Sequence, residues 1–245
     1  MRKRNKMKNN KITWTDEKTR KLFADTGLAE FADITGIQEN SVAKTRIMRE
    51  HRDRNTGEVN RRMTEIKLNG QVFYLKYACG SAFENIRNEF NALEILPQFN
   101  LTPPTAAAYA FDNDALEGWI LFKALAGRFS IKEIITGVAP QEAIDDFLER
   151  KVDILESIAG KIREVHKNGY AYPDWFAKHL YIQPDSDEIV LIDLERFRPL
   201  AKSPWYFGFP ITSLFVKSKF WRKLRNSLKS DILPDKLLKK ILKEH

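Results

Sequence analysis

A four-residue apolar run that ends in a carboxylate places the tightest constraint on this chain. The run spans positions 189–192, reading IVLI, and Asp193 follows it directly. A short apolar run bounded by polar residues predicts a buried strand, which then delivers Asp193 to a site at its end. Asp174 and His179 precede the run and are five positions apart, and Asp174 directly follows Pro173. Two carboxylates in this order suit phosphoryl transfer, which needs positioning and charge neutralisation more than covalent chemistry.

These polar residues suit different roles. Asp174 is expected on a loop, where it can orient an attacking hydroxyl or accept its proton. Asp193 can bind Mg²⁺, which prefers one or two carboxylates together with substrate phosphates. His179 has two open roles: it can orient Asp174 or a phosphate by hydrogen bonding, or it can bind the metal, although imidazole is a poor ligand for a hard cation. Taken singly, Asp174 could be a turn residue and Asp193 a strand-end cap.

The strongest local signal in the N-terminal half is Asn69-Gly70, which separates two β-prone runs at 63–68 and 71–77. Both turn residues tolerate positive φ, so the pattern predicts a β-hairpin. Lys76 lies near the end of the second strand, where its ammonium can hold nucleotide phosphates as a compact charge. The alternative is an exposed strand lysine.

A helix is expected next, from about Ala82 to Leu96, because apolar residues recur there at helical spacing. The helical phase of Glu89 differs from that of these apolar residues, so Glu89 lies beside the apolar stripe rather than within it. We therefore select it, rather than Glu84 or Glu94, as the acidic partner of Lys76.

The order of the elements predicts an α+β fold with two lobes. Residues 1–39 are expected to form a basic extension with short helices. Residues 40–125 are expected to form a nucleotide-binding N-lobe with an antiparallel sheet. Residues 126–245 are expected to form a mainly helical C-lobe with the catalytic loop, a long helix at about 141–167 and a basic C-terminus. The nucleotide is expected in the cleft between the lobes.

Charge and composition bound the partners and the compartment. The chain has 245 residues, a net charge of +8 and a single cysteine, Cys79. No transmembrane helix or secretory signal is expected, so the protein is predicted to be cytoplasmic. Both ends are basic, which either aids solubility or attracts phosphates of nucleic acid, anionic lipid or a glycan. Aromatic residues among the basic residues of 215–225 suggest peripheral contact with the anionic inner membrane, the alternative being packing on the C-lobe.

Four segments together resemble the lipopolysaccharide core kinases, a family with a protein-kinase-like fold that phosphorylates heptose or Kdo sugars of the inner core. They read NRRMTEIKLNGQVFYLKYA, IRNEFNALEIL, VHKNGYAYPDWFAKHLYI and VLIDLERFR, and span about residues 60–198. The family pairs a strand lysine with the glutamate of an R-N-E-type helix motif, which Lys76 and Glu89 match. Its loop motif resembles H-R-D-L-Y-x-x-H, which Asp174 and His179 match.

The metal-binding aspartate of that family lies in an I-D-L-x-R motif, which Asp193 and Arg196 match. The chain departs from the family in the loop motif, where Tyr172 and Pro173 replace histidine and arginine. The loop carboxylate itself is retained at Asp174, so the resemblance still implies a catalytic base.

The resemblance implies an ATP- and Mg²⁺-dependent phosphotransferase that acts on a sugar hydroxyl of lipopolysaccharide inner core, heptose or Kdo, or of a related glycolipid. Lys76 and Glu89 would then bind the nucleotide, Asp174 and His179 would be catalytic, and the metal would lie at Asp193 and His179. Two alternatives stay open: a catalytically inactive pseudokinase scaffold, and a basic module that binds nucleic acid. Nucleic acid is the less favoured partner because the chain carries no recognised nucleic-acid motif.

Overall fold

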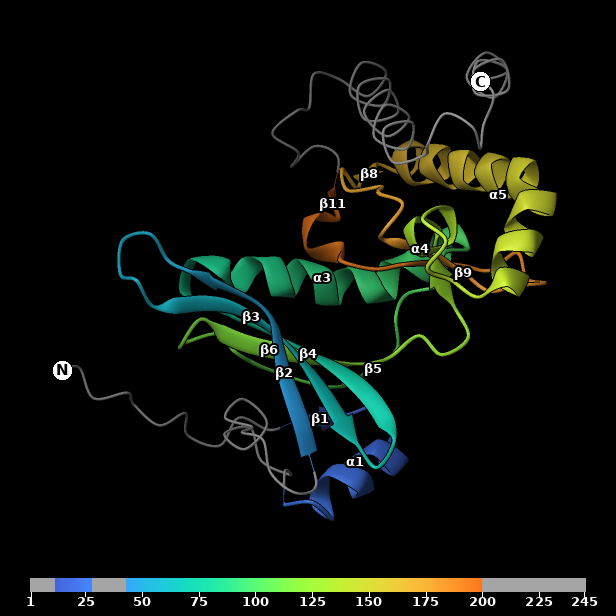
Figure 1. Ribbon diagram of the computed structural model, residues 1–245. Coiled ribbons are helices and arrows are strands. Elements are labelled where there is room, and N and C mark those ends of the chain that lie inside the picture. Colours follow the sequence, from blue (N-terminus) through green and yellow to red (C-terminus); the bar gives the residue numbers. More distant parts are fainter. Residues whose placement is uncertain (1–11, 28–42, 200–245) are drawn as a thin grey trace. The chain divides into compact units, whose positions relative to one another are not determined.

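The computed structural model describes residues 12–27 and 43–199 (Figure 1). Contacts divide the chain into two compact units. Unit 1 comprises Met1–Phe90 and Pro104–Ala124, and unit 2 comprises Asn91–Pro103 and Leu125–His245. The sequence analysis places residues 91–103 in the N-lobe, which is expected to span residues 40–125. In the structure these residues belong to unit 2.

Unit 1 is built on a six-stranded antiparallel sheet with the strand order β1-β5-β6-β4-β3-β2. This sheet confirms the expected α+β class, with strands early in the chain. Its strands are β1 (Thr13–Trp14), β2 (Ala43–Arg52), β3 (Val59–Leu68), β4 (Gln71–Cys79), β5 (Ala106–Asp112) and β6 (Glu117–Lys123).

The predicted hairpin is formed by β3 and β4. Asn69 and Gly70 both have positive φ, 47° and 78°, which is the backbone conformation that this tight turn requires. The turn fixes the register in which Leu68 pairs with Gln71. With this register Lys76 lies opposite Met63 on one side and Ile120 on the other. Lys76 is therefore held on a strand that is paired along both edges.

The helix α1 (Glu17–Ala24) packs against one face of this sheet. Phe23 of α1 is fully buried, and its ring packs edge-on against Phe73 of β4 at 5.2 Å. Asp16 caps the helix by accepting hydrogen bonds from the backbone of Lys18 and Thr19. Within residues 1–39, where short helices are expected, α1 is such a helix, but Thr13–Trp14 instead pairs with β5 as strand β1.

The opposite face carries α3 (Phe83–Ile95), as Figure 1 shows. This helix confirms the one predicted from about Ala82 to Leu96. Its Phe90 ring packs against Tyr109 and Phe111 of β5, with centroid distances of 4.3 and 5.2 Å. Because successive strand residues face opposite ways, Phe73 points to α1 and Lys76 points to the α3 face.

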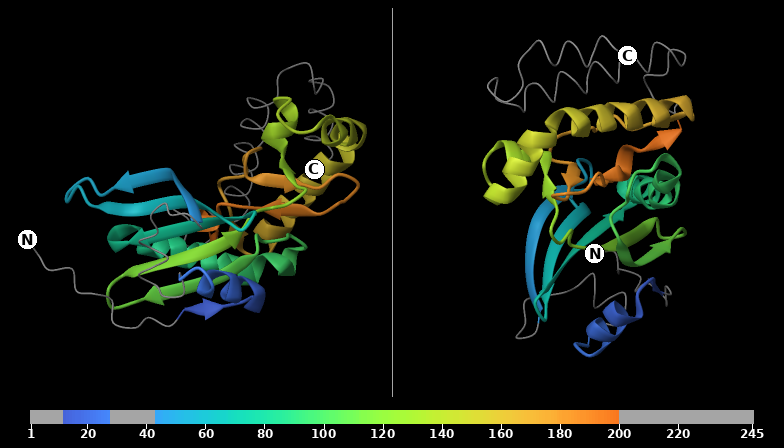
Figure 2. Two further views of the ribbon diagram at one scale, coloured as in Figure 1. Left: turned by 60° about the horizontal axis from the view of Figure 1, so that its bottom comes forward. Right: turned by 90° about the vertical axis from the view of Figure 1, so that its right-hand side faces the viewer.

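Unit 2 is organised around α5 (Gln141–Lys167), the helix expected at 141–167 and drawn in yellow in Figure 2. Its buried positions recur every three or four residues, as in Leu155, Ile158, Ile162 and Val165. The other helices are α4 (Ile131–Ile135) and the 3₁₀ turns η2 (Leu96–Phe99) and η3 (Leu194–Arg196). The strands are β7 (Phe129–Ser130), β8 (Tyr170–Ala171), β9 (Leu180–Ile182), β10 (Ile189–Leu191) and β11 (Arg198–Pro199).

The strand predicted from the apolar run is β10, which pairs with β9 and is buried at every position. Asp193 therefore lies just beyond the end of a fully buried strand, as the sequence predicts. Among the described helices, none is both long enough and apolar enough to cross a membrane.

Candidate active site

Lys76 and Glu89 form an ion pair within unit 1. Nζ of Lys76 lies 2.6 Å from Oε1 of Glu89, and the two side chains are 19% and 3% exposed. The strand β4 supplies the lysine and the helix α3 supplies the glutamate. A charge-assisted hydrogen bond of this length, largely shielded from water, fixes the direction of the ammonium. The structure therefore does not show the exposed strand lysine that was the alternative.

The ammonium of Lys76 also lies 5.8 Å from the ring centroid of Phe122 on β6. This distance is within the range of a cation–π interaction. The lysine is thus oriented by a carboxylate and an aromatic ring. An ammonium held in this way is a compact and directed positive charge, which is the form in which lysine binds phosphate.

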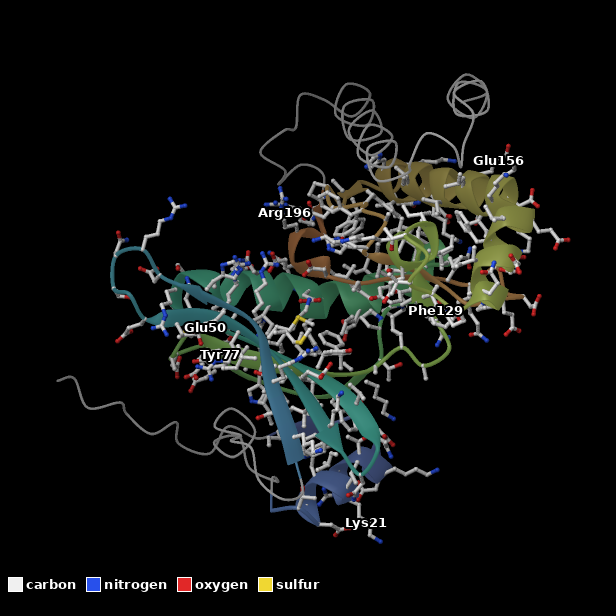
Figure 3. The ribbon with its side chains drawn as sticks, viewed as in Figure 1. Lys21, Glu50, Tyr77, Phe129, Glu156 and Arg196 are labelled. Carbon is white, nitrogen blue, oxygen red and sulfur yellow. The ribbon has the colours of Figure 1, made fainter. Side chains whose placement is uncertain are left out.

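Asp174 is buried on the loop between β8 and β9 in unit 2, where the sequence predicts a loop. The backbone N–H of Phe176 donates to its carbonyl oxygen at 2.7 Å. Its carboxylate accepts from Nη1 of Arg196, at 2.9 Å to Oδ1 and 3.1 Å to Oδ2. Figure 3 labels Arg196 on the segment that carries η3. The loop carboxylate is thereby held in a fixed orientation by a cation from a later turn.

His179 ends the same loop and is buried. Its Nδ1 lies 2.9 Å from the carbonyl oxygen of Asp174 and 3.2 Å from the hydroxyl oxygen of Tyr172. A carbonyl oxygen only accepts, so we assign the proton to Nδ1. Burial lowers the pKa of His179, which favours the neutral ring with an unprotonated Nε2.

Asp193 follows β10, and its Oδ2 lies 3.3 Å from Nε2 of His179. The carboxylate of Asp193 is 30% exposed, which makes it the more accessible of this pair. Its backbone adopts the left-handed conformation, with φ 61° and ψ 53°. His179 therefore contacts both carboxylate residues of unit 2: it binds the Asp174 backbone through Nδ1 and faces the Asp193 side chain through Nε2.

The donor set at Asp193 fits a divalent cation bound partly by substrate. Across residues 12–27 and 43–199, no three His, Cys, Asp or Glu side chains are grouped closely enough to hold a metal by themselves. Mg²⁺ is commonly bound through one or two carboxylates while phosphates and water complete its shell. In addition, the unprotonated Nε2 of His179 and the carboxylate of Asp193 are both electron-pair donors. Asp193 is the residue that would hold the metal, with His179 beside it.

The structure thus brings the predicted residues together in two groups, one in each unit. Lys76 and Glu89 form the first group, and Asp174, His179 and Asp193 form the second. Sequence reasoning assigned no contact to Arg196 or Tyr172, although both border the second group. The sequence drew attention to Arg196 through the I-D-L-x-R match and to Tyr172 because it replaces the histidine of the loop motif. Neither observation indicated which residue the side chain would contact. The basic C-terminus lies outside the described residues.

The chain is similar to known kinases along most of its length. The model of the "Lipopolysaccharide kinase (Kdo/WaaP) family" matches residues 39–204. Among curated proteins, no sequence gives a significant match. A solved structure of WaaP in complex with acyl carrier protein resembles the chain with a TM-score of 0.55 and 18% identity, covering 96% of this chain and 97% of that one.

Two kinase structures are also similar. The autoinhibited serine kinase domain of titin has a TM-score of 0.41 and 14% identity, over 64% of this chain and 46% of that one. Vaccinia-related kinase 3 has a TM-score of 0.40 and 14% identity, over 85% and 77%. The family match extends over the segments that carry both groups of site residues, and the family consists of kinases that phosphorylate sugar hydroxyl groups. The chain belongs to the lipopolysaccharide kinase (Kdo/WaaP) family.

Proposed function

We propose that this protein transfers the γ-phosphoryl group of ATP to a sugar hydroxyl of the lipopolysaccharide inner core, on heptose or Kdo. The observation that carries the proposal is the Asp174–His179–Asp193 cluster, in which one histidine contacts a loop aspartate and a strand-end aspartate. The Lys76–Glu89 ion pair of unit 1 adds support. Each group has its own role in the transfer.

Lys76 binds phosphate oxygens of ATP, and Glu89 keeps its ammonium directed. The carboxylate of Asp174 orients the sugar hydroxyl and accepts its proton as the oxygen attacks phosphorus. Because Arg196 contacts both carboxylate oxygens, the rotation of Asp174 is restricted and its hydrogen bond to the substrate is directed. Positioning of this kind supplies a large share of the rate in phosphoryl transfer.

Asp193 is the carboxylate that would hold Mg²⁺, and bound Mg²⁺ neutralises charge on the transferring phosphoryl group. His179 holds the geometry around it, since its Nδ1–H donates to the Asp174 carbonyl while Nε2 faces Asp193. We infer that its main role is orientation, because imidazole is a poor ligand for a hard cation.

The proposed acceptor is a glycolipid of the inner core, so the protein is proposed to work in the cytoplasm and at the inner membrane surface. Support for the sugar class comes from the family to which the chain belongs. An acyl carrier protein is a further candidate partner, by analogy with the WaaP complex alone. Size-exclusion chromatography of the two purified proteins together tests this partner, and separate elution of the two would reject a stable complex.

The experiment that tests the function is mass spectrometry of core glycolipid after incubation with the protein and Mg-ATP. The expected result is a mass increase of one phosphate, and fragment ions then distinguish heptose from Kdo. Asp174→Asn should abolish the increase and leave ATP binding largely intact, because it removes the base and keeps the shape of the side chain. Asp187→Asn is a matched control, since the Asp187 side chain is 97% exposed.

Two outcomes would reject the proposal. Absence of phosphate on every core glycolipid tested, from a protein that binds ATP, would favour a scaffold without catalysis. Full transfer by Asp174→Asn would remove Asp174 from the role of base.

A further inference from the structure

The backbone at Asp193 is in a conformation that needs support. Its φ of 61° lies in the left-handed region, which residues other than glycine adopt at a cost, although aspartate tolerates it better than most. Four other non-glycine residues of the described chain have positive φ, namely Asn69, Asn100, Leu116 and Asp185. Only Asp193 among these five is a residue of the proposed site. The direction of its carboxylate depends on this backbone conformation.

The hydroxyl of Tyr172 contacts the backbone carbonyl groups on both sides of the Asp193 Cα atom. It lies 2.9 Å from the carbonyl oxygen of Ile192 and 3.1 Å from that of Asp193. Both atoms are acceptors, so the hydroxyl donates and its single proton is shared between them. Its oxygen also lies 3.2 Å from Nδ1 of His179, from which it accepts. One hydroxyl therefore joins the loop histidine to the turn that carries Asp193.

The ring of Tyr172 is held in place by packing. Tyr172 is fully buried, and its ring lies edge-on to Trp175 at 5.6 Å and tilted to Phe197 at 6.5 Å. A rigid ring presents its hydroxyl without further loss of side-chain freedom. Additional backbone contacts close the same turn: the N–H of Ile192 donates to the carbonyl of His179 at 3.0 Å, and that of Phe197 to Leu194 at 2.9 Å.

We propose that Tyr172 is a positioning residue, whose hydroxyl keeps Asp193 in the left-handed conformation that directs its carboxylate to the metal and the nucleotide phosphates. This inference rests on the proposed function. The hydroxyl acts through the backbone of Ile192 and Asp193 and through His179. Removal of the hydroxyl takes this donor from two partly buried carbonyl groups, so the left-handed turn becomes less populated.

The test is Tyr172→Phe, which removes the hydroxyl and keeps the packed ring. The matched control is Tyr170→Phe on β8, whose ring packs against Phe99 and Phe197 at 5.8 and 5.4 Å. Amide hydrogen exchange of segment 189–197, measured by mass spectrometry without nucleotide or metal, reports the turn directly. We expect exchange there to rise about tenfold in Tyr172→Phe, equivalent to about 1.4 kcal/mol, and to be unchanged in Tyr170→Phe.

Kinetics supply the second readout. In Tyr172→Phe, kcat should fall about tenfold and the Mg²⁺ concentration for half-maximal activity should rise, while KM for ATP changes little because the Lys76–Glu89 pair is intact. A purely structural role would not separate these parameters. Equal increases of exchange in 189–197 and in α5 would mean that the hydroxyl supports only global stability, and would overturn the inference.

Unchanged exchange and unchanged kcat in Tyr172→Phe would also overturn it. A different result would reject the proposed function: no phosphate transfer by the wild-type protein. In that case the exchange measurement, which needs neither ATP nor acceptor, still shows whether Tyr172 holds the turn.

Discussion

Nη1 of Arg196 lies between the two carboxylate oxygens of Asp174, 2.9 Å from one and 3.1 Å from the other. The two residues are 22 positions apart, one on the loop after β8 and the other on η3. Because η3 starts directly after Asp193, the same turn carries the proposed metal ligand and the cation that orients the proposed base. A shift of this turn would displace both groups together.

Arg196→Ala should lower kcat by about a hundredfold, since a misplaced reacting group typically costs about that factor. Arg196→Lys should lower it by about tenfold, because a lysine keeps the charge and loses the planar guanidinium. Steady-state kinetics of phosphate transfer give both values, and KM for ATP should stay unchanged. Arg150→Lys is the control, since Arg150 pairs with Asp146 and Asp187 instead. Wild-type kcat in Arg196→Ala would contradict the orienting role.

Lys76→Ala should remove the stabilisation of the protein by nucleotide. Mg-ATP at about 100 times its Kd stabilises a binding protein by about 2.7 kcal/mol, which is measurable as a rise in Tm. We expect this rise in the wild-type protein and in Lys67→Ala, because the Lys67 side chain on β3 is 55% exposed and lies outside the ion pair with Glu89. Glu89→Gln should weaken the rise as well. The same rise in Lys76→Ala as in the wild type would exclude this lysine from nucleotide binding.

Acid should destabilise the protein through His166. Burial lowers the pKa of this residue to about 4, from an ordinary value of 6.5. Above pH 6.5 the residue is neutral in the folded and unfolded states and has no effect. Between pH 6.5 and 4 only the unfolded state takes up the proton, so the free energy of unfolding decreases as pH falls, by about 3 kcal/mol in all. Below pH 4 both states are protonated and the loss stops.

Urea unfolding between pH 7 and 4 measures this dependence. In His166→Leu the slope of unfolding free energy against pH should be smaller over the same window, whatever the stability of the variant at pH 7. Equal slopes for the two proteins would show that other groups cause the acid sensitivity.

Phe23→Ala should lower the free energy of unfolding by about 3–5 kcal/mol, the usual cost of truncating a buried phenylalanine. Phe23 is fully buried against Phe73. Ile47→Ala provides the control on the same sheet, because Ile47 is 57% exposed, and it should change stability by less than about 0.5 kcal/mol. Equal urea midpoints for Phe23→Ala and the wild type would mean that α1 contributes little to the core of unit 1.

The first half of the site could be predicted because local patterns determine it. Asn69 and Gly70 fix the turn and hence the strand that carries Lys76, and the helical phase of α3 singles out Glu89. The two residues are only 13 positions apart, so few arrangements of a hairpin and the following helix are available. The buried strand β10 and the position of Asp193 at its end follow from an equally local signal.

The remaining contacts depend on distant segments and could not be predicted. Arg196 reaches Asp174 only because η3 turns the chain back after β10, and no local pattern encodes the left-handed φ of Asp193. Likewise, strand β1 forms because Thr13 pairs with Tyr109, a residue far away in the sequence. The ion pair between Asp16 and Lys123, with 2.6 Å between Oδ2 and Nζ, joins residues 107 positions apart.

The N-terminal segment has a practical consequence for any shortened version of the protein. The family match starts at residue 39, yet Phe23 and Asp16 already belong to the packed body of unit 1. A fragment cut at the family limits would leave Phe73 and Trp119 on a bare apolar surface and would be prone to aggregate. Expression trials should therefore retain the chain from before Ile12, because the region shared with the family and the folding unit do not have the same boundary.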